Sequence, residues 1–332
     1  MNWPTPRWWY QRRGAPVTRA LLTPLSWIWA FVTARRIAGT HPFDTRRPVI
    51  CVGNLTVGGT GKTPVVRELV RRLQNNGRGA HILTRGYGGS LKGPVQVAVR
   101  SHTAAEVGDE PLMLAADAAV WVAQDRKAGA ARAVTAGAQM LVMDDGHQNP
   151  SVKKTLSLVV VDGETRDGEW PLGGGGVVPA GPLREPLKAG LARAHAVIVL
   201  LPADLPQADP KLLALFGKTP VLIARLVPDA PPPEGPQLGF AGIGKPWKVE
   251  RALKAAGCDL KDFAAFPDHG PYSEAILKTL AATAKSLDAG LVTTEKDWTR
   301  LPAPWRDRVT SWPVRVEFED EAAIEALLAR AV

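Results

Sequence analysis

Residues 49–64 read Val49-Ile50-Cys51-Val52-Gly53-Asn54-Leu55-Thr56-Val57-Gly58-Gly59-Thr60-Gly61-Lys62-Thr63-Pro64. The stretch begins as a short apolar strand, turns through glycines and ends on Gly-Lys-Thr, and an amphipathic helical pattern follows it. Glycines let successive backbone N–H groups face one anion, and the helix N-terminus adds partial positive charge. This pattern predicts a P-loop in which Lys62 reaches the β- and γ-phosphates and Thr63 ligates Mg²⁺. The predicted nucleotide-binding residues are Thr56, Val57, Gly58, Gly59, Thr60, Gly61, Lys62 and Thr63.

One position departs from the standard P-loop pattern. A glycine is expected five residues before Gly61, and Thr56 stands there instead. A glycine-rich strand-to-helix turn without nucleotide is therefore an alternative. Gly58, Gly59 and Gly61 around a Lys-Thr pair favour the nucleotide site.

The overall charge predicts an acidic partner. The chain has 332 residues and a formal net charge of +9, which suits nucleic acid, an anionic membrane or a phosphorylated substrate. Such a length allows one large or two ordinary domains. Cys51 and Cys258 show no metal-type spacing, which indicates a reducing compartment and no disulfide framework.

The first 36 residues combine arginine with aromatic residues and contain no Asp or Glu. Their apolar stretch, residues 20–32, is shorter than the about 20 residues that a bilayer-spanning helix needs. Tryptophan and arginine on its flanks favour a helix on an anionic membrane surface. A secretory signal peptide and a helix packed on the protein's own core are the alternatives. The aromatic residues before and within the stretch are Trp3, Trp8, Trp9, Tyr10, Trp27 and Trp29, with Phe31 near its end.

Three later segments place polar residues where a strand ends or a helix begins. Arg85 and Tyr87 follow the predicted strand 80–84 in a glycine-rich loop, which is a candidate substrate loop. Asp109 and Glu110 stand at a predicted helix start, where acids commonly act as caps. Asp144 and Asp145 follow an apolar strand, and two adjacent acids there favour a bound Mg²⁺.

Further apolar runs at 156–161, 196–200 and 221–223 alternate with helical segments and predict a doubly wound, mostly parallel sheet. Residues 228–236 are proline-rich and read as a linker. We therefore expect an α/β fold with an N-terminal segment at 1–36, a P-loop core at 37–227 and a smaller α/β domain at 228–332.

Together these motifs resemble one family, the tetraacyldisaccharide 4'-kinases of lipid A biosynthesis. The family's own loop also lacks the first P-loop glycine. The blocks that carry the resemblance span about residue 48 to 297, and they are the stretches 52–64, 85–89, 108–111, 144–146, 179–186, 241–244, 268–269 and 293–297.

The resemblance implies transfer of the ATP γ-phosphate to the 4'-hydroxyl of a tetraacyl disaccharide 1-phosphate, giving lipid IVA. It implies a P-loop core with Mg²⁺, attached peripherally to the cytoplasmic face of the bacterial inner membrane. It assigns Asp109 as the catalytic base, with His269 as its partner. Neither nucleic acid nor an obligate protein partner is implied. The acids that it places around metal and nucleotide are Glu110, Asp144, Asp145 and Glu185.

Four residues depart from the family pattern: His147, Asn149, Gly174 and Gly270. The first stands where the family usually has a phenylalanine ring. A P-loop GTPase-like switch or metallochaperone is the competing function, because it uses a similar Gly-Lys-Thr loop. A nucleic-acid-dependent ATPase is disfavoured, because the excess positive charge concentrates at the N-terminus.

Overall fold

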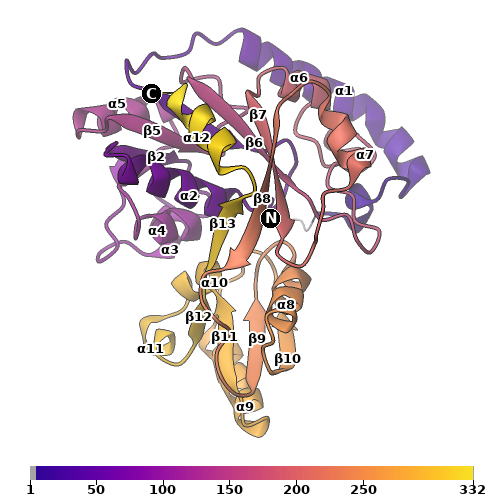
Figure 1. The fold of residues 1–332 in the computed structure, drawn as a ribbon, viewed down its shortest axis with the longest axis vertical. Coiled ribbons are helices and arrows are strands. Elements are labelled where there is room, and N and C mark those ends of the chain that lie inside the picture. Colours follow the sequence, from indigo (N-terminus) through magenta and orange to yellow (C-terminus); the bar gives the residue numbers. More distant parts are fainter. Residues whose placement is uncertain (1–4, 332) are drawn as a thin grey trace.

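The computed structural model describes residues 5–331, so Trp3 lies outside the described residues. Two β-sheets are stacked along the long axis of the molecule, with the larger one above and the smaller one below in Figure 1. The larger sheet has nine strands in the order β13-β8-β7-β6-β1-β5-β2-β4-β3. Their bounds are β1 Val49–Gly53, β2 Ala80–Thr84, β3 Val95–Gln96, β4 Val120–Val122, β5 Met140–Asp144, β6 Leu156–Asp162, β7 Ala196–Pro202, β8 Val221–Pro228 and β13 Val314–Phe318.

The centre of the large sheet is parallel and buried on both faces. β1 pairs in parallel with β5 on one side and β6 on the other, and every residue of these three strands is buried. Only the edge strands β3 and β13 pair antiparallel. Strands covered on both faces are apolar throughout rather than alternating, which is why their sequences could be recognised. The predicted mostly parallel α/β fold is confirmed.

The helices of the large sheet connect its strands. They are α2 Lys62–Asn75, α3 Ala104–Val107, α4 Asp109–Leu114, α5 Arg126–Thr135, α6 Leu187–Leu191, α7 Pro210–Leu213, the 3-10 turn η2 Ala214–Phe216 and α12 Glu321–Ala329. Helix α2 carries the predicted amphipathic pattern: Val65, Val66 and Leu69 are fully buried against the sheet. Burying this face fixes the start of α2, and with it Lys62, at the end of β1.

The smaller sheet is entirely parallel, in the order β10-β9-β11-β12. It packs a separate apolar core around Phe240, Leu277 and Trp305. Its elements are β9 Gln237–Ala241, α8 Pro246–Ala255, β10 Leu260–Ala265, α9 Glu274–Ser286, β11 Gly290–Thr294, α10 Glu295–Thr299, α11 Ala303–Arg306 and β12 Thr310–Trp312.

The end of the chain returns to the large sheet. β13 pairs with β8, and the side chain of Arg72 on α2 forms ion pairs with Glu321 and Glu325 of α12. The expected second domain, 228–332, therefore differs from the observed arrangement, in which the small sheet ends at β12. Only one residue separates β12 from β13, so the sequence carries no linker that would mark this return.

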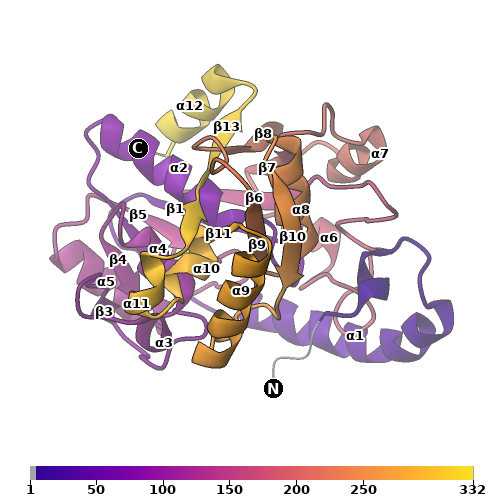
Figure 2. The same ribbon diagram turned by 90° about the horizontal axis from the view of Figure 1, so that it is seen from below.

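The N-terminal helix α1, Pro16–Ala38, lies lengthwise along the outside of the large sheet, preceded by the 3-10 turn η1, Arg7–Tyr10 (Figures 1 and 2). It is longer than the expected stretch 20–32. Ser26 donates to the carbonyl oxygen of Val177 at 2.7 Å, and the Trp29 indole donates to that of Arg184 at 3.0 Å. Polar groups of α1 therefore face the protein.

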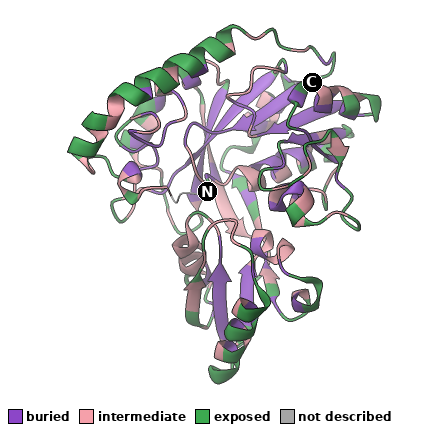
Figure 3. Cartoon of the chain, turned by 180° about the vertical axis from the view of Figure 1, so that it is seen from behind, coloured by how far each residue is buried: buried purple, intermediate pink, exposed green. Residues whose placement is uncertain are grey.

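The apolar side chains of α1 face away from the protein. Leu21, Leu25, Ile28 and Val32 recur at helical spacing and are 75%, 53%, 61% and 58% exposed. Figure 3 shows most of α1 as exposed. Within residues 5–331, α1 is the one helix long and apolar enough to cross a membrane, by length and composition only. The alternative of a helix whose apolar face is buried on the protein's own core does not fit this orientation.

Candidate active site

The P-loop joins the end of β1 to the start of α2. Gly58 and Gly61 have φ angles of +99° and +77°, in the left-handed region that glycine adopts without strain. A Cβ at Gly61 would also lie 2.3 Å from a Leu200 methyl carbon. Helix α2 begins at Lys62, so its unpaired N–H groups open toward the loop. These features form an anion cradle of the kind that the sequence predicts.

The loop is held from outside by two other segments. Arg184 donates from its backbone N–H to the Leu55 carbonyl oxygen at 2.7 Å and from Nε to that of Thr56 at 3.0 Å. From η1, the Tyr10 hydroxyl donates to the Val57 carbonyl oxygen at 2.5 Å. The N-terminal segment is thus bonded directly to the nucleotide loop.

Two adjacent carboxylates at the end of β5 have opposite electrostatic environments. Burial opposes ionisation of Asp145, but the charges of Lys62 and Arg184 outweigh it and lower its pKa to about 2. The Arg184 guanidinium lies 2.8 Å from Asp145 Oδ1, and Lys62 Nζ lies 3.7 Å from it. Asp144 is buried, and burial together with the charge of Glu110 raises its pKa to about 7.

Asp144 has the properties of a metal ligand. Its Oδ2 accepts a hydrogen bond from Thr84 at 3.3 Å, while its buried Oδ1 has no hydrogen-bond partner among the described residues. A bound cation would compensate the negative charge of this buried carboxylate. No group of three or more His, Cys, Asp or Glu side chains within residues 5–331 could hold a metal by itself. Mg²⁺ commonly takes one or two carboxylates plus substrate phosphates, so Asp144 with Thr63 fits it.

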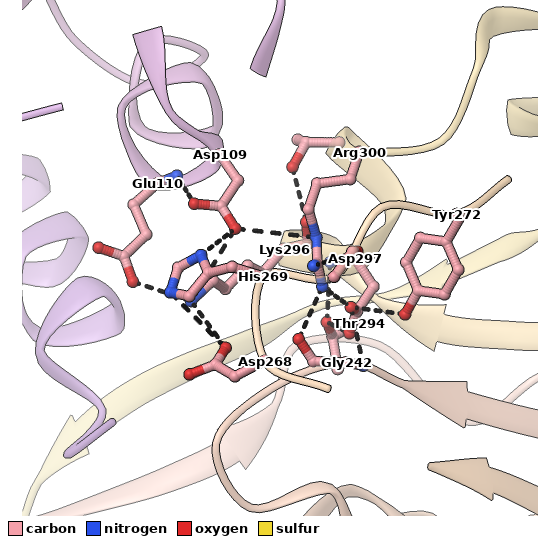
Figure 4. Close-up of polar contacts among 12 residues, drawn as sticks. Asp109, Glu110, Gly242, Asp268, His269, Tyr272, Thr294, Lys296, Asp297 and Arg300 are labelled. Carbon is pink, nitrogen blue, oxygen red and sulfur yellow. Dashed lines mark hydrogen bonds and ion pairs between the residues drawn. The ribbon is translucent and has the colours of Figure 1, made fainter. Parts of the chain in front are cut away.

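A second polar cluster forms where the small sheet meets α4 (Figure 4). Asp109 begins α4, and His269 follows β10 in a turn, with a φ of 57°. The His269 Nδ1 lies 2.9 Å from Asp109 Oδ2. The Asp109 side chain is 4% exposed and that of His269 is 20% exposed. Residues 160 positions apart thus form an Asp–His pair.

Positive charges surround this pair. Burial would raise the pKa of Asp109, but the hydrogen bond from His269 and the charges of Lys296 and Arg300 outweigh it and lower that pKa. Lys296 lies 3.0 Å from Glu110 Oε1 and 3.3 Å from His269 Nε2. Since Lys296 can only donate, this contact makes Nε2 the acceptor and Nδ1 the donor to Asp109. Asp109 is therefore a carboxylate at neutral pH.

Comparison with known proteins identifies the family. A sequence profile described as LpxK, tetraacyldisaccharide-1-P 4'-kinase, matches residues 18–332. The chain is 69% identical to the tetraacyldisaccharide 4'-kinase of Caulobacter sp. (strain K31), over 99% of this chain and 98% of that protein. The protein belongs to the tetraacyldisaccharide 4'-kinase family. It is therefore a kinase, as the sequence motifs imply.

Other relatives agree with this assignment. The tetraacyldisaccharide 4'-kinase of Phenylobacterium zucineum is 66% identical over 99% of both chains. A crystal structure of LpxK from Aquifex aeolicus in complex with ATP has a TM-score of 0.74 and 26% identity, over 95% of this chain and 99% of that chain. This likeness supports ATP as the nucleotide of the kinase.

The predicted substrate loop of the kinase lies beside the Asp–His pair. Arg85 and Tyr87 follow β2 and are exposed. The Tyr87 ring centroid is 5.3 Å from that of His269, in an edge-to-face arrangement. The loop thus brings an exposed aromatic ring to the side chains that the resemblance assigns to catalysis.

Glu185 is bonded to Arg193 and Gln148. Both of its carboxylate oxygens are 2.7 Å from Arg193 Nη2, and Oε1 also accepts from Gln148 at 3.0 Å. The same Gln148 amide donates to the Asn54 carbonyl oxygen in the P-loop at 2.8 Å. Glu185 is therefore already paired with a cation, and its contacts support a role in bracing the loop through Gln148.

Three family departures have a structural explanation. His147 is buried, its Nδ1 lies 3.0 Å from Ser157 Oγ, and burial lowers its pKa to about 4, so it packs as a neutral ring. A Cβ at Gly174 would lie 2.3 Å from Arg19 Nη1. The glycine thus lets the N-terminal arginine approach. Asn149 accepts from the backbone N–H of Ser151 in a tight turn.

Three basic residues of the site were not given roles from the sequence. Lys296 and Arg300 lie on or next to α10, and Arg126 begins α5 after β4. Burial lowers the pKa of Arg126 to about 10, against the charges of Asp144 and Asp145. A search for cations within a few residues of a strand end would have found Arg126, four positions after the last residue of β4, as well as Arg85.

Proposed function

We propose that this kinase transfers the γ-phosphate of ATP to the 4'-hydroxyl of a tetraacyl disaccharide 1-phosphate, with Asp109 as the general base. The observation that carries the proposal is the Asp109–His269 contact of 2.9 Å between the two sheets. Glu110, the next residue, is close enough to raise the pKa of Asp144 by its charge. The base thus belongs to the same electrostatic cluster as the residues that face the phosphates.

Each group then has a defined task. The P-loop N–H groups and Lys62 hold the β- and γ-phosphates, and Asp109 accepts the proton of the attacking hydroxyl. The hydrogen bond from His269 orients the Asp109 carboxylate and stabilises its negative charge. When bound by Thr63 and Asp144, with Asp145 and Glu110 nearby, Mg²⁺ would neutralise developing phosphate charge. Phosphoryl transfer depends mainly on such positioning, since the protein does little covalent chemistry.

The substrate is held between the two sheets in this proposal. A large domain is formed by the nine-stranded sheet with 313–331, and a small domain by 237–312, in place of the expected division at 228. Tyr87, beside His269, and Arg85, two residues before it, contact the phosphorylated sugar. A cation suits its phosphate, and an aromatic ring suits the face of a sugar.

The proposed location is the cytoplasmic face of the inner membrane, through α1. Its outward apolar face and its polar inward face are the reverse of a helix that packs on its own protein. The exposed arginines Arg7, Arg12, Arg13, Arg35 and Arg36 flank this face and would meet anionic lipid, whereas Arg19 donates to backbone carbonyl oxygens of the N-terminal segment. The contact from Tyr10 to the P-loop would keep the nucleotide close to the lipid.

Charged substitutions on the outward face of α1 test this attachment. The double substitution Leu25→Glu and Ile28→Glu is expected to reduce binding to anionic vesicles at least about tenfold, because two exposed apolar side chains no longer enter the interface. Sedimentation with vesicles measures it. These substitutions are preferable to deleting the segment, since deletion would also remove the Tyr10 bond.

The control is Leu215→Glu, an exposed apolar side chain away from α1, which should bind vesicles as the wild type does. Unchanged binding of the α1 variant, with its fold intact, would place the attachment elsewhere.

The activity itself is tested by incubating the purified protein with Mg²⁺, labelled ATP and a tetraacyl disaccharide 1-phosphate. We expect label in the lipid, and little ATP hydrolysis without it. Brisk hydrolysis without lipid and no label in the lipid would instead favour a nucleotide-dependent switch.

A further inference from the structure

We propose that Arg300 is a positioning residue for the Asp109–His269 pair, holding the His269 turn with one side of its guanidinium and presenting the other to Asp109. This inference rests on the proposed function, because it needs Asp109 to be the base. Arg300 directly follows α10 in the small domain, whereas Asp109 begins α4 in the large one. The contact therefore bridges the two domains at the reacting pair.

The guanidinium holds two backbone segments at the His269 turn, the one that follows His269 and the one to which His269 is hydrogen-bonded (Figure 4). Its Nη1 donates to the Gly270 carbonyl oxygen at 2.9 Å, and its Nη2 donates to that of Gly242 at 2.8 Å. The Gly242 carbonyl oxygen also accepts the backbone N–H of His269 at 3.3 Å. One side chain thus holds the carbonyl after His269 and the carbonyl to which His269 itself is bonded.

The Arg300 side chain is itself rigidly held. It forms an ion pair with Asp297, which is fully buried and also accepts from the Tyr272 hydroxyl and the Gly242 N–H. Because Asp297 has several fixed donors, it can orient the guanidinium plane. A forked donor set of this kind is specific to arginine, since lysine offers a single point charge.

The remaining nitrogen faces the base. Arg300 Nε is buried, has no hydrogen-bond partner within residues 5–331, and lies 3.7 Å from Asp109 Oδ2. An arginine that served only the small domain would not need its last donor directed across the domain boundary. The titratable and charged groups that face Asp109 are His269, Lys296 and Arg300, with Glu110 and Asp268 around them.

A double-mutant cycle tests this inference. We expect Arg300→Met to lower kcat by about 10–100-fold with ATP KM changed less than about twofold, because the base loses its alignment but the P-loop is untouched. In an Asp109→Asn background the same substitution is expected to lower kcat by less than about twofold, since no base remains to be aligned. If Arg300 had only a structural role, Arg300→Met would lower kcat by the same factor in both backgrounds.

The matched control is Arg306→Met. Arg306 also donates to backbone carbonyl oxygens, those of Leu301 and Thr299, at 3.0 and 2.9 Å, but no contact joins it to Asp109 in the described structure. It should keep wild-type kcat. If Arg300→Met does not fold, Arg300→Lys replaces it, with an expected loss in kcat of about 3–10-fold, since an ammonium cannot serve both carbonyls and Asp109.

The outcomes separate the two proposals. Equal losses from Arg300→Met in both backgrounds, or wild-type kcat in Arg300→Met or Arg300→Lys, would overturn the positioning role alone. Wild-type kcat in Asp109→Asn would instead overturn the proposed base, whatever the Arg300 variants show.

Discussion

Replacing Asp109 by alanine is expected to lower turnover by about 10² or more while the ATP KM changes little. The carboxylate accepts a hydrogen bond from His269 and lies outside the loop that is proposed to bind the nucleotide. Its pKa is lowered by neighbouring positive charge, so it is ready to accept a proton at neutral pH. Steady-state kinetics with the lipid acceptor, varied against ATP, measure both constants.

Asp117→Ala is the matched control for this substitution. Asp117 follows α4 and pairs with Arg67 at 2.7 Å. The substitution therefore removes a carboxylate of similar type from the same region. It should keep near wild-type turnover. His269→Ala should fall between the two, because Asp109 keeps its charge but loses its orienting bond. Turnover like the wild type in Asp109→Ala would contradict the base assignment.

Asp144→Asn is expected to lower turnover by about 10² or more and at the same time to stabilise the metal-free protein at pH 8. Activity falls because the variant loses the carboxylate that fits Mg²⁺. A bound Mg²⁺ would stabilise the transition state by several kcal/mol. The gain in stability follows from burial, since Asp144 Oδ1 has no hydrogen-bond partner among residues 5–331 and its ionised form is costly.

The pH dependence distinguishes this gain from a general effect. The pKa of Asp144 is raised to about 7 in the folded protein, against about 3.9 in an unfolded chain. Between these values the folded state binds more protons, so the free energy of unfolding of the wild type falls as the pH rises. The variant lacks this loss. Its Tm should exceed that of the wild type by about 3–8 °C at pH 8 and by less than half as much at pH 5, and the two Tm values should converge below about pH 4.

Thermal unfolding without Mg²⁺ or nucleotide measures this difference. Asp44→Asn is the control, because Asp44 is exposed and paired with Lys153. It should change neither Tm nor turnover appreciably. A lower Tm for Asp144→Asn at pH 8 would show that the Asp144 carboxylate is satisfied in the metal-free protein.

The sequence alone was sufficient for the P-loop and the central strands. The roles of Gly58, Gly61 and Lys62 can be predicted from the local sequence, because a left-handed turn, a helix start and a phosphate-binding amine need no distant partner. The fully apolar strands β1, β5 and β6 are recognisable for the same reason. Even Asp144 and Asp145 could be placed, since both follow a strand that must end at the P-loop edge of the sheet.

Only the tertiary structure decided which charges meet. The Asp109–His269 pair was implied by resemblance, but Arg300 became its neighbour only through the packing of the small domain on α4. The outward direction of the apolar face of α1 and the return of β13 to the large sheet were decided in the same way. Backbone patterns act over a few residues and can be read along the chain. Coulombic and hydrogen-bond contacts depend on distances between remote residues, which exist only once the chain has folded.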